Sequence, residues 1–285
     1  MWRFALVLAA CSSSSPKALP PTVFGGDRPA TLQVPAELDG GKVDTGRQYP
    51  LVMVLHGYGA SGFVQEAYFG MNMIAPANLG FVIAPDGLTD STGNEYWNAD
   101  PACCDFDHAN PDDSGYLGGL IDDIEAAWPA VDPGAMLVIG HSNGGYMAYR
   151  MACDHADTVT NIIVLAGAAA SDPSTCNPTL PVAVLHMHGT ADTEVPYVPN
   201  AAASVMQWAG HDGCATTTTA GANVDLDQGI PGAETTTESY DDCPPGTAVD
   251  LWSIQGGTHI PSLDQPVFAP MMMQYFQAHR RLLPD

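Results

Sequence analysis

The pentapeptide Gly140-His141-Ser142-Asn143-Gly144 limits the possible folds of this 285-residue chain more than any other segment. It directly follows the apolar run 135–139, which predicts a buried strand, and it opens the stretch 144–153, which predicts a helix. A serine at such a tight strand-to-helix turn needs glycines beside it, because a Cβ there would collide with the neighbouring strand or helix. The sequence therefore predicts a strained nucleophile turn with Ser142 as the reactive residue.

The rest of the chain alternates between predicted strands and predicted helices. The run 51–56 is continuously apolar, as is typical of a strand buried on both faces. Further strands are predicted at 81–85, 161–165, 182–185 and 247–254, and helices at 114–128 and 266–282. This alternation predicts an α/β fold with a mostly parallel central sheet and helices on both faces. We expect one domain over residues 31–285, with the Thr- and Gly-rich residues 215–238 as an insertion.

A serine hydroxyl needs a base within hydrogen-bonding reach before it can act as a nucleophile. In folds with this type of nucleophile turn, the acid and then the histidine follow the serine along the chain. His259 lies in a glycine-rich loop between the last predicted strand and the last predicted helix, so we expect it to be the base. Asp192 follows the strand predicted at 182–185 and is expected to orient the imidazole. The alternatives for the acid are Asp172 and Glu194.

An oxyanion hole requires backbone N–H donors near the nucleophile. One is expected from Asn143, directly after Ser142, and the other from Tyr58 in the glycine-rich segment 56–59. Four other histidines are expected to be structural, packing or loop residues: His56, His141, His186 and His188. The i, i+2 spacing of the last two is also compatible with a metal pair, but the chain has no EF-hand loop and no HExxH motif. We therefore predict neither a metal nor a cofactor.

The charge balance excludes two classes of partner. The chain has 8 basic and 32 acidic residues, which gives a formal net charge of −24. Such a chain repels nucleic acid phosphates and anionic lipid headgroups, so we expect neither as a partner. Hydrophobic residues make up 46% of the chain, which predicts a folded protein with an acidic, solvated exterior rather than a disordered chain.

Residues 1–11 have the features of an export signal. Arg3 precedes the apolar run 4–10, and Leu8-Ala9-Ala10-Cys11 resembles a bacterial lipobox, in which the cysteine is lipidated. An ordinary secretory signal is the alternative, and both predict an extracytoplasmic protein, secreted or lipid-anchored at the bacterial cell envelope. Residues 12–30 are rich in Ser, Pro and Gly, which predicts a flexible linker. No later run of about 18 apolar residues follows, so membrane contact is expected only through a lipid anchor at Cys11.

Six further cysteines predict disulfides, because their number is even and the chain is expected to leave the cytoplasm. Cys214 and Cys243 are expected to bond to each other. Adjacent cysteines seldom bond together, so we expect Cys103 and Cys104 to reach two different partners, Cys153 and Cys176. A zinc site is the alternative, but the chain has no CxxC motif to support it.

Several of these segments together resemble a known family. The matching residues are His56-Gly-Tyr-Gly, Trp97 with Cys103 and Cys104, the segment 140–153 around Ser142, His188-Gly-Thr-Ala-Asp192 with its continuation to Tyr197, and Gly-Gly-Thr-His259. Over residues 28–282 the chain resembles the polyhydroxybutyrate depolymerase-like esterases, with the related feruloyl and acetylxylan esterases of carbohydrate esterase family one. The resemblance implies an α/β-hydrolase fold and a secreted, cofactor-free serine esterase with Ser142, Asp192 and His259 as its triad.

Two departures from the family narrow the expected substrate. The family commonly has His-x-Trp-Pro after the catalytic histidine, whereas this chain has His259-Ile260-Pro261. No polymer- or carbohydrate-binding module follows the closing helix, so we expect soluble or oligomeric feruloyl, acetyl or 3-hydroxyalkanoate esters as substrates. Trp97, Tyr58 and Tyr197 are candidates for lining the ester site, with ordinary packing as the equal alternative. The competing functions are a peptidase on the same fold and a non-catalytic surface-binding lipoprotein.

Overall fold

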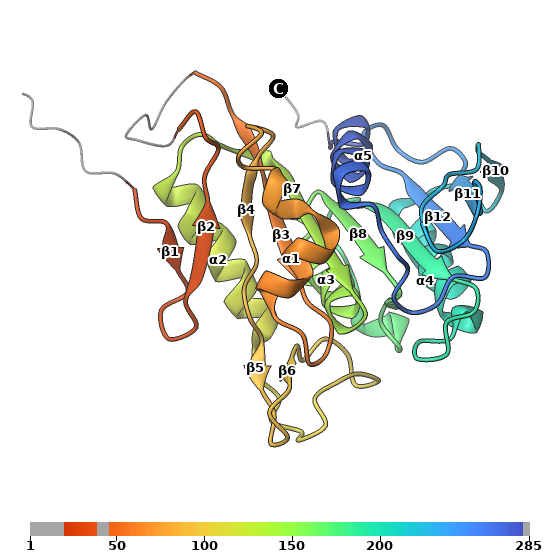
Figure 1. The fold of residues 1–285 in the computed structure, drawn as a ribbon, viewed down its shortest axis with the longest axis horizontal. Helices are drawn as coiled ribbons and strands as arrows, with labels where there is room; N and C mark the ends of the chain where they lie inside the picture. Colours follow the sequence, from red (N-terminus) through yellow and green to blue (C-terminus); the bar gives the residue numbers. More distant parts are fainter. Residues whose placement is uncertain (1–19, 39–45, 282–285) are drawn as a thin grey trace, which may run out of the picture.

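A computed structural model describes residues 20–38 and 46–281 of the chain (Figure 1). The predicted signal at 1–11, the predicted lipidation site Cys11 and the first part of the predicted linker lie outside the described residues. The described part forms one large sheet with helices on both faces (Figure 1). The predicted α/β-hydrolase fold is confirmed.

The central sheet has ten strands in the order β1-β2-β4-β3-β7-β8-β9-β12-β11-β10. The six inner strands from β4 to β12 run parallel, and the outer strands at both edges pair antiparallel. In chain order the strands of this sheet are β1 Val23–Phe24, β2 Ala30–Gln33, β3 Tyr49–Leu55, β4 Phe81–Ile83, β7 Val131–His141, β8 Asn161–Leu165, β9 Ala183–Gly189, β10 Thr218–Ala220, β11 Thr235–Tyr240 and β12 Val249–Ile254. A separate two-stranded sheet pairs β5 Leu88–Thr89 with β6 Glu95–Tyr96.

Five α-helices cover the two faces of the sheet: α1 Gly62–Phe69, α2 Asp113–Ala127, α3 Asn143–Asp154, α4 Tyr197–Asp212 and α5 Gln265–Ala278. Alternate residues of β3 point to opposite faces, as the pleat of a strand requires. Leu51 and Met53 pack in a core cluster with α2, α3 and α4, whereas Val52 and Val54 pack in a second cluster with α1 and α5. Among the described residues we find no helix long and apolar enough to cross a membrane.

The predicted elements differ from the observed ones mainly at their ends. Strand β8 has the predicted bounds, but β9 extends to Gly189 and therefore contains His186 and His188, which were expected at a strand end. Helices α1 and α4 were not predicted. Residues 215–238, expected to be an insertion, contain β10 and the first part of β11, which lengthen one edge of the sheet.

The predicted flexible linker of residues 12–30 is wrong from residue 20 onward. Val23–Phe24 pairs with β2 as an edge strand. The guanidinium of Arg28 donates a 2.7 Å hydrogen bond to the buried carboxylate of Asp113 and lies 3.9 Å above the ring of Tyr116. These contacts place Arg28 directly against α2.

The structure also corrects the predicted disulfide pairing. The three bonds are Cys103–Cys104, Cys153–Cys176 and Cys214–Cys243. The last was expected, but the prediction that the adjacent cysteines reach two different partners is wrong. The chain that follows β8 returns to the end of α3 and places Cys176 against Cys153, with Cα atoms 5.4 Å apart. This separation is in the usual range for a disulfide, so both expected partners of the adjacent cysteines are already used.

Candidate active site

Ser142 lies between the end of β7 and the start of α3, as the sequence predicted. Its backbone has φ 52° and ψ −120°, a conformation that non-glycine residues rarely adopt and that is concentrated at functional sites. The flanking glycines are required by space. A Cβ on Gly140 would lie 2.1 Å from the carbonyl oxygen of Gly144, and a Cβ on Gly144 would lie 2.2 Å from that of Leu55. The local geometry is that of a nucleophile turn.

His259 and Asp192 form a buried pair in the loops that follow β12 and β9. The distance between His259 Nδ1 and Asp192 Oδ2 is 2.7 Å. The other carboxylate oxygen, Oδ1, accepts hydrogen bonds from the backbone N–H groups of Glu194 and Val195 at 2.9 and 3.0 Å. Because the carboxylate accepts the proton on Nδ1, the neutral imidazole keeps its lone pair on Nε2. This nitrogen is therefore available as a base.

The structure distinguishes Asp192 from the two alternative acids. Asp172 caps the short 3-10 helix Pro173–Thr175 and accepts hydrogen bonds from the backbone and hydroxyl of Ser174. Glu194 has a largely exposed side chain, and its Oε2 lies 3.8 Å from Nε2 of His259. Neither carboxylate reaches Nδ1, the nitrogen that an orienting acid must hold.

His141 connects the His259 loop to the nucleophile turn. Burial lowers the pKa of His141 to about 4, so its ring is neutral at neutral pH and donates from Nε2 to the carbonyl oxygen of His259 at 2.9 Å. Gly57, in the loop after β3, lies beside His141 and Ser142. A Cβ on Gly57 would be 3.4 Å from Cβ of Ser142. The loops after β3, β7 and β12 thus meet at the carboxyl edge of the sheet.

The side chain of Asn143 fixes the residue after the nucleophile to a neighbouring loop. Its Oδ1 accepts from the backbone N–H of Trp97 at 2.7 Å, and its Nδ2 donates to the carbonyl oxygen of Trp97 at 2.9 Å. The Trp97 indole N–H in turn donates to the carbonyl oxygen of His56 at 3.1 Å. Trp97 is fully buried, which agrees with the alternative of ordinary packing.

The two predicted tyrosines have different surroundings. Tyr58 lies in the loop after β3, and its hydroxyl hydrogen-bonds with Asp90 and Asn94, away from the nucleophile turn. Tyr197 is half-buried at the start of α4, where its hydroxyl lies 2.7 Å from Oγ of Ser253. The backbone N–H groups of Tyr58 and Asn143 remain predicted oxyanion donors.

A model of the phospholipase/carboxylesterase family matches residues 43–218, well over half of the chain. The chain belongs to this family. The matched segment runs from β3 to β10 and contains Ser142 and Asp192.

Curated relatives of this carboxylesterase-family chain carry esterase names. It is 34% identical to "Putative esterase NocK" of Nocardia uniformis subsp. tsuyamanensis over 149 residues, which are 52% of this chain and 41% of the relative. It is 26% identical to feruloyl esterase D of Neurospora crassa over 202 residues, 70% of this chain and 60% of that esterase. A poly(3-hydroxybutyrate) depolymerase of Ralstonia pickettii is 33% identical over 128 residues, 41% of this chain and 25% of the depolymerase. The chain thus spans about half the length of the first two relatives, and the predicted family resemblance is confirmed.

A solved structure confirms the fold of this carboxylesterase-family chain. An acetyl xylan esterase from Aspergillus awamori superposes with a TM-score of 0.66 at 16% sequence identity, over 87% of this chain and 93% of that one. At this identity the likeness concerns the fold alone. The prediction of a carboxylic ester hydrolase agrees with the family and with the names of the relatives.

Sequence reasoning missed one buried group of this family member. His186 and His188 were expected to be packing or loop residues, but in β9 they form a line of polar contacts with Tyr149 and Asp192. The i, i+2 spacing of these histidines could have indicated the group, since residues two apart in a strand point to the same face. The strand was predicted to end at 185, so the spacing was interpreted only as compatible with a metal pair.

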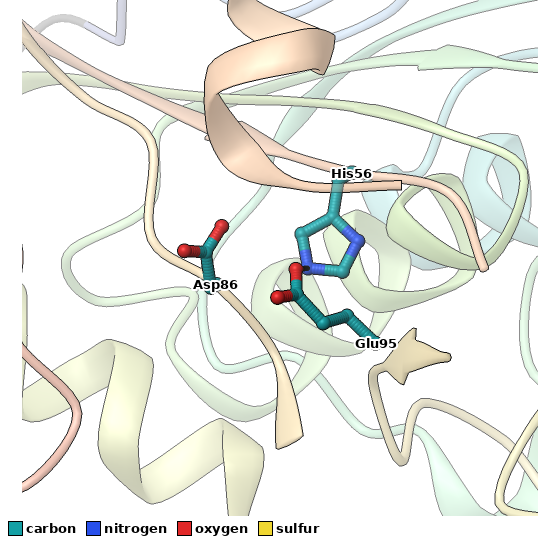
Figure 2. Close-up of side chains that lie close together, drawn as sticks. All are labelled: His56, Asp86 and Glu95. Carbon is teal, nitrogen blue, oxygen red and sulfur yellow. Dashed lines mark ion pairs between the residues drawn. The ribbon is translucent and has the colours of Figure 1, made fainter. Parts of the chain in front are cut away.

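One group of side chains has the composition of a metal site. Ligand atoms of His56, Asp86 and Glu95 lie within 4.8 Å of one another (Figure 2). However, His56 Nε2 already accepts the backbone N–H of Gly87 at 2.9 Å, and Nδ1 lies 2.8 Å from the carbonyl oxygen of Gly57. Both ring nitrogens are used within the protein, so His56 offers no free lone pair to a cation. We therefore assign His56 a structural role in supporting the loop after β3.

A hollow of about 400 Å³ lies along α3, close to the nucleophile turn. Its wall includes Tyr146, one helical turn after Ser142, together with Tyr149, Trp208, Arg150 and Asp100. Ser142, Asp192 and His259 do not line this hollow, so it is adjacent to these three residues and is not a pocket that they form. Its aromatic walls and charged rim suit a mixed polar and apolar group.

Proposed function

We propose that this chain is an exported serine esterase in which Ser142 is the nucleophile, His259 the general base and Asp192 its orienting acid. The observation that carries the proposal is the buried Asp192–His259 hydrogen bond, whose loop His141 links to the turn where Ser142 is held at positive φ between two sterically required glycines. A purely binding protein has no physical need for this combination. Membership in the carboxylesterase family supports the same chemistry.

In the proposed reaction, Oγ of Ser142 attacks the acyl carbon while its proton moves to Nε2 of His259. The backbone N–H groups of Asn143 and Tyr58 stabilise the negative oxygen of the tetrahedral intermediate. The intermediate expels the alcohol, which takes the proton from His259, and leaves an acyl-enzyme. Water then attacks the acyl-enzyme, again with His259 as base, and releases the carboxylic acid and free Ser142.

The proposed substrates are soluble or oligomeric carboxylic esters with a feruloyl, acetyl or 3-hydroxyalkanoate acyl group. Support comes from the names of the relatives, which include feruloyl esterase and poly(3-hydroxybutyrate) depolymerase. The hollow along α3 has room for part of such a substrate, and Tyr146 in its wall lies one helical turn after Ser142. We propose no metal, cofactor or nucleic acid as a partner.

The proposed location is extracytoplasmic. Three disulfides among the described residues support it, because disulfides persist in oxidising compartments and are rare in the cytosol. A lipid anchor at Cys11 remains part of this proposal. Mass spectrometry of the protein isolated from a bacterial envelope tests it, since a diacylglycerol-modified Cys11 would be the first residue of the mature chain.

The decisive experiment compares initial hydrolysis rates of methyl ferulate, a soluble 3-hydroxybutyrate oligomer and phenyl acetate. Ser142→Ala should abolish hydrolysis and block labelling by a fluorophosphonate, whereas the matched control Ser171→Ala, at an exposed serine, should behave like wild type. The fastest ester identifies the acyl preference. A folded wild-type protein that cleaves none of the three and takes no label would contradict the proposal. Cleavage of a peptide amide at comparable rates would favour a peptidase instead.

A further inference from the structure

A line of buried polar side chains leads from α3 to the proposed catalytic acid. The Tyr149 hydroxyl lies 2.8 Å from Nδ1 of His186, and Nε2 of His186 lies 3.0 Å from Nδ1 of His188. Nε2 of His188 lies 2.8 Å from the carbonyl oxygen of Val195 and 3.3 Å from Oδ2 of Asp192. Both imidazoles are fully buried, and their ring planes are nearly parallel, with an interplanar angle of 11°.

The donor and the acceptor of every hydrogen bond in this line follow from its last bond, between His188 and Val195. The carbonyl oxygen of Val195 can only accept, so Nε2 of His188 carries a proton and points it toward Val195 and Asp192. Burial lowers the pKa of His188 and of His186, so both rings are neutral and carry one proton each. Nδ1 of His188 is therefore a bare acceptor, which requires a proton on Nε2 of His186. Nδ1 of His186 is then also bare and accepts the Tyr149 hydroxyl.

The turn that holds Asp192 is stabilised from both sides by this arrangement. Asp192 Oδ1 accepts the N–H of Val195 inside the turn, while the carbonyl oxygen of Val195 accepts the N–H of His188 from β9. The carboxylate oxygen that holds His259 is also the one facing His188. A rotation of the turn or of the His188 ring would break the contacts of His188 with both Val195 and Asp192 at once.

We propose that His188 is a positioning residue for the catalytic acid, and that His186 and Tyr149 fix the tautomer in which His188 donates toward Asp192 and Val195. This inference rests on the proposed function, because it assigns a role relative to the Asp192–His259 pair. Packing alone does not explain the group: apolar side chains of similar shape would fill the core without the desolvation cost of three polar groups. The line is instead hydrogen-bonded at every step and points in one direction.

The first test measures the tautomers directly and needs no activity. Long-range proton–nitrogen spectra of the full-length protein with nitrogen-15 histidine, assigned by triple-resonance spectra, should show a protonated Nε2 and a bare Nδ1 on both His186 and His188. The same spectra of Tyr149→Phe, which removes only one hydroxyl, should show a changed Nδ1 signal on His186. A protonated Nδ1 on His188 in the wild type overturns the proposal.

The second test uses a matched pair of variants at one position. His188→Phe keeps an aromatic ring but removes the N–H, and should lower kcat by about 10- to 100-fold with KM unchanged, the range expected for one hydrogen bond to a charged group. His188→Gln can place an amide N–H near the original Nε2 and should recover most of kcat. Folding of each variant is checked by circular dichroism and thermal unfolding.

The outcomes separate this inference from the proposed function. A wild type that cleaves no ester contradicts the proposed function, while the tautomer spectra still decide the hydrogen-bond directions. An active wild type with a folded His188→Phe of unchanged kcat, or with His188→Gln as impaired as His188→Phe, contradicts the positioning role alone. If neither variant folds, the wild-type spectra decide.

Discussion

Among single residues, Asp212 at the end of α4 has its protonation controlled by burial. Its Oδ1 accepts the backbone N–H of Val182 at 3.1 Å, and its Oδ2 is buried with no hydrogen-bond partner among the described residues. Desolvation by burial raises the pKa of this carboxyl to about 7, although the Val182 N–H and the Arg281 guanidinium act in the opposite direction. The folded protein therefore binds this proton up to neutral pH, whereas the unfolded chain releases it near pH 4.

The sign of the resulting pH dependence can be tested with Asp212→Asn. Since the folded-state pKa is the higher one, the contribution of Asp212 is most favourable below about pH 4 and decreases as the pH rises to about 7. The free energy of unfolding of Asp212→Asn, relative to wild type, should therefore increase from pH 4 to pH 8, by up to about 4 kcal/mol. Urea unfolding of both proteins across this range is the measurement. A constant difference would show that Asp212 titrates normally.

Some features of the proposed site can be predicted from the sequence, whereas others depend on the folded structure. Ser142 is predicted from its glycines, and Asp192 and His259 from their order along the chain and their places after strands. The two readings of Trp97 stayed open because the burial of one aromatic depends on the whole fold, which here places it in contact with Asn143 and His56. The tautomers of His186 and His188 depend on the carbonyl oxygen of Val195, whose position only the folded turn supplies.

At the scale of elements, the packing of α3 against β3 can be tested by replacing two glycines that lie in helices. A methyl group on Gly144 would lie 2.2 Å from the carbonyl oxygen of Leu55, whose strand cannot retreat because Leu55 pairs with Gly140 in the sheet. Gly144→Ala should therefore lower the free energy of unfolding by about 2–3 kcal/mol and reduce esterase activity with it.

Gly119 in the middle of α2 is the matched control for this variant. A methyl group there meets no atom within 4 Å, and alanine is a better helix former than glycine. Gly119→Ala should raise the free energy of unfolding by about 1 kcal/mol and leave activity unchanged. Urea unfolding of both variants beside wild type gives the comparison. Equal effects of the two substitutions would contradict the close packing of α3 on β3.

The elements that were missed had weak periodic signals but clear end signals. Helix α1 has no buried apolar stripe, since Phe63 and Val64 are exposed, but Ser61 caps its start and Gly70 ends it with φ 68°. Helix α4 has a non-helical residue at Val198 before a proline, which interrupts the pattern. The parallel strands were easier to predict because burial on both faces makes them continuously apolar. Disulfide pairing required knowing that the chain after β8 returns to α3, which spacing does not contain.

For the molecule as a whole, the class, the single mostly parallel sheet and the place of the site at its carboxyl edge were predictable from the alternation of elements. The extent of the sheet was not. Its antiparallel edges at β1–β2 and β10–β11 arise from segments whose sequences predict a linker and an insertion, because the outermost strands β1 and β10 are short and largely exposed. The ordered structure of these edge segments depends on contacts between distant parts of the chain, such as the contact of Arg28 with Asp113.

The net charge of −24 is a property of the whole molecule with a consequence for substrate choice. A strongly negative surface lowers the local concentration of anionic substrates, and salt screens the effect as the Debye length falls from about 30 Å at 0.01 M to about 8 Å at 0.15 M. We expect KM for 4-acetoxybenzenesulfonate, an anionic aryl ester, to fall by about two- to tenfold over this range. KM for uncharged phenyl acetate should stay constant.

One variant separates the field of the whole molecule from that of an exposed carboxylate beside the proposed base. Glu194, 3.8 Å from His259, is the exposed acidic residue beside the proposed base. If the general surface charge repels the anionic ester, Glu194→Gln should show nearly the same salt dependence of KM as wild type. Loss of the salt dependence in this variant would assign the repulsion to Glu194 alone. Because the acid product of ester hydrolysis is itself an anion, a long-range negative field would also favour its departure from the site.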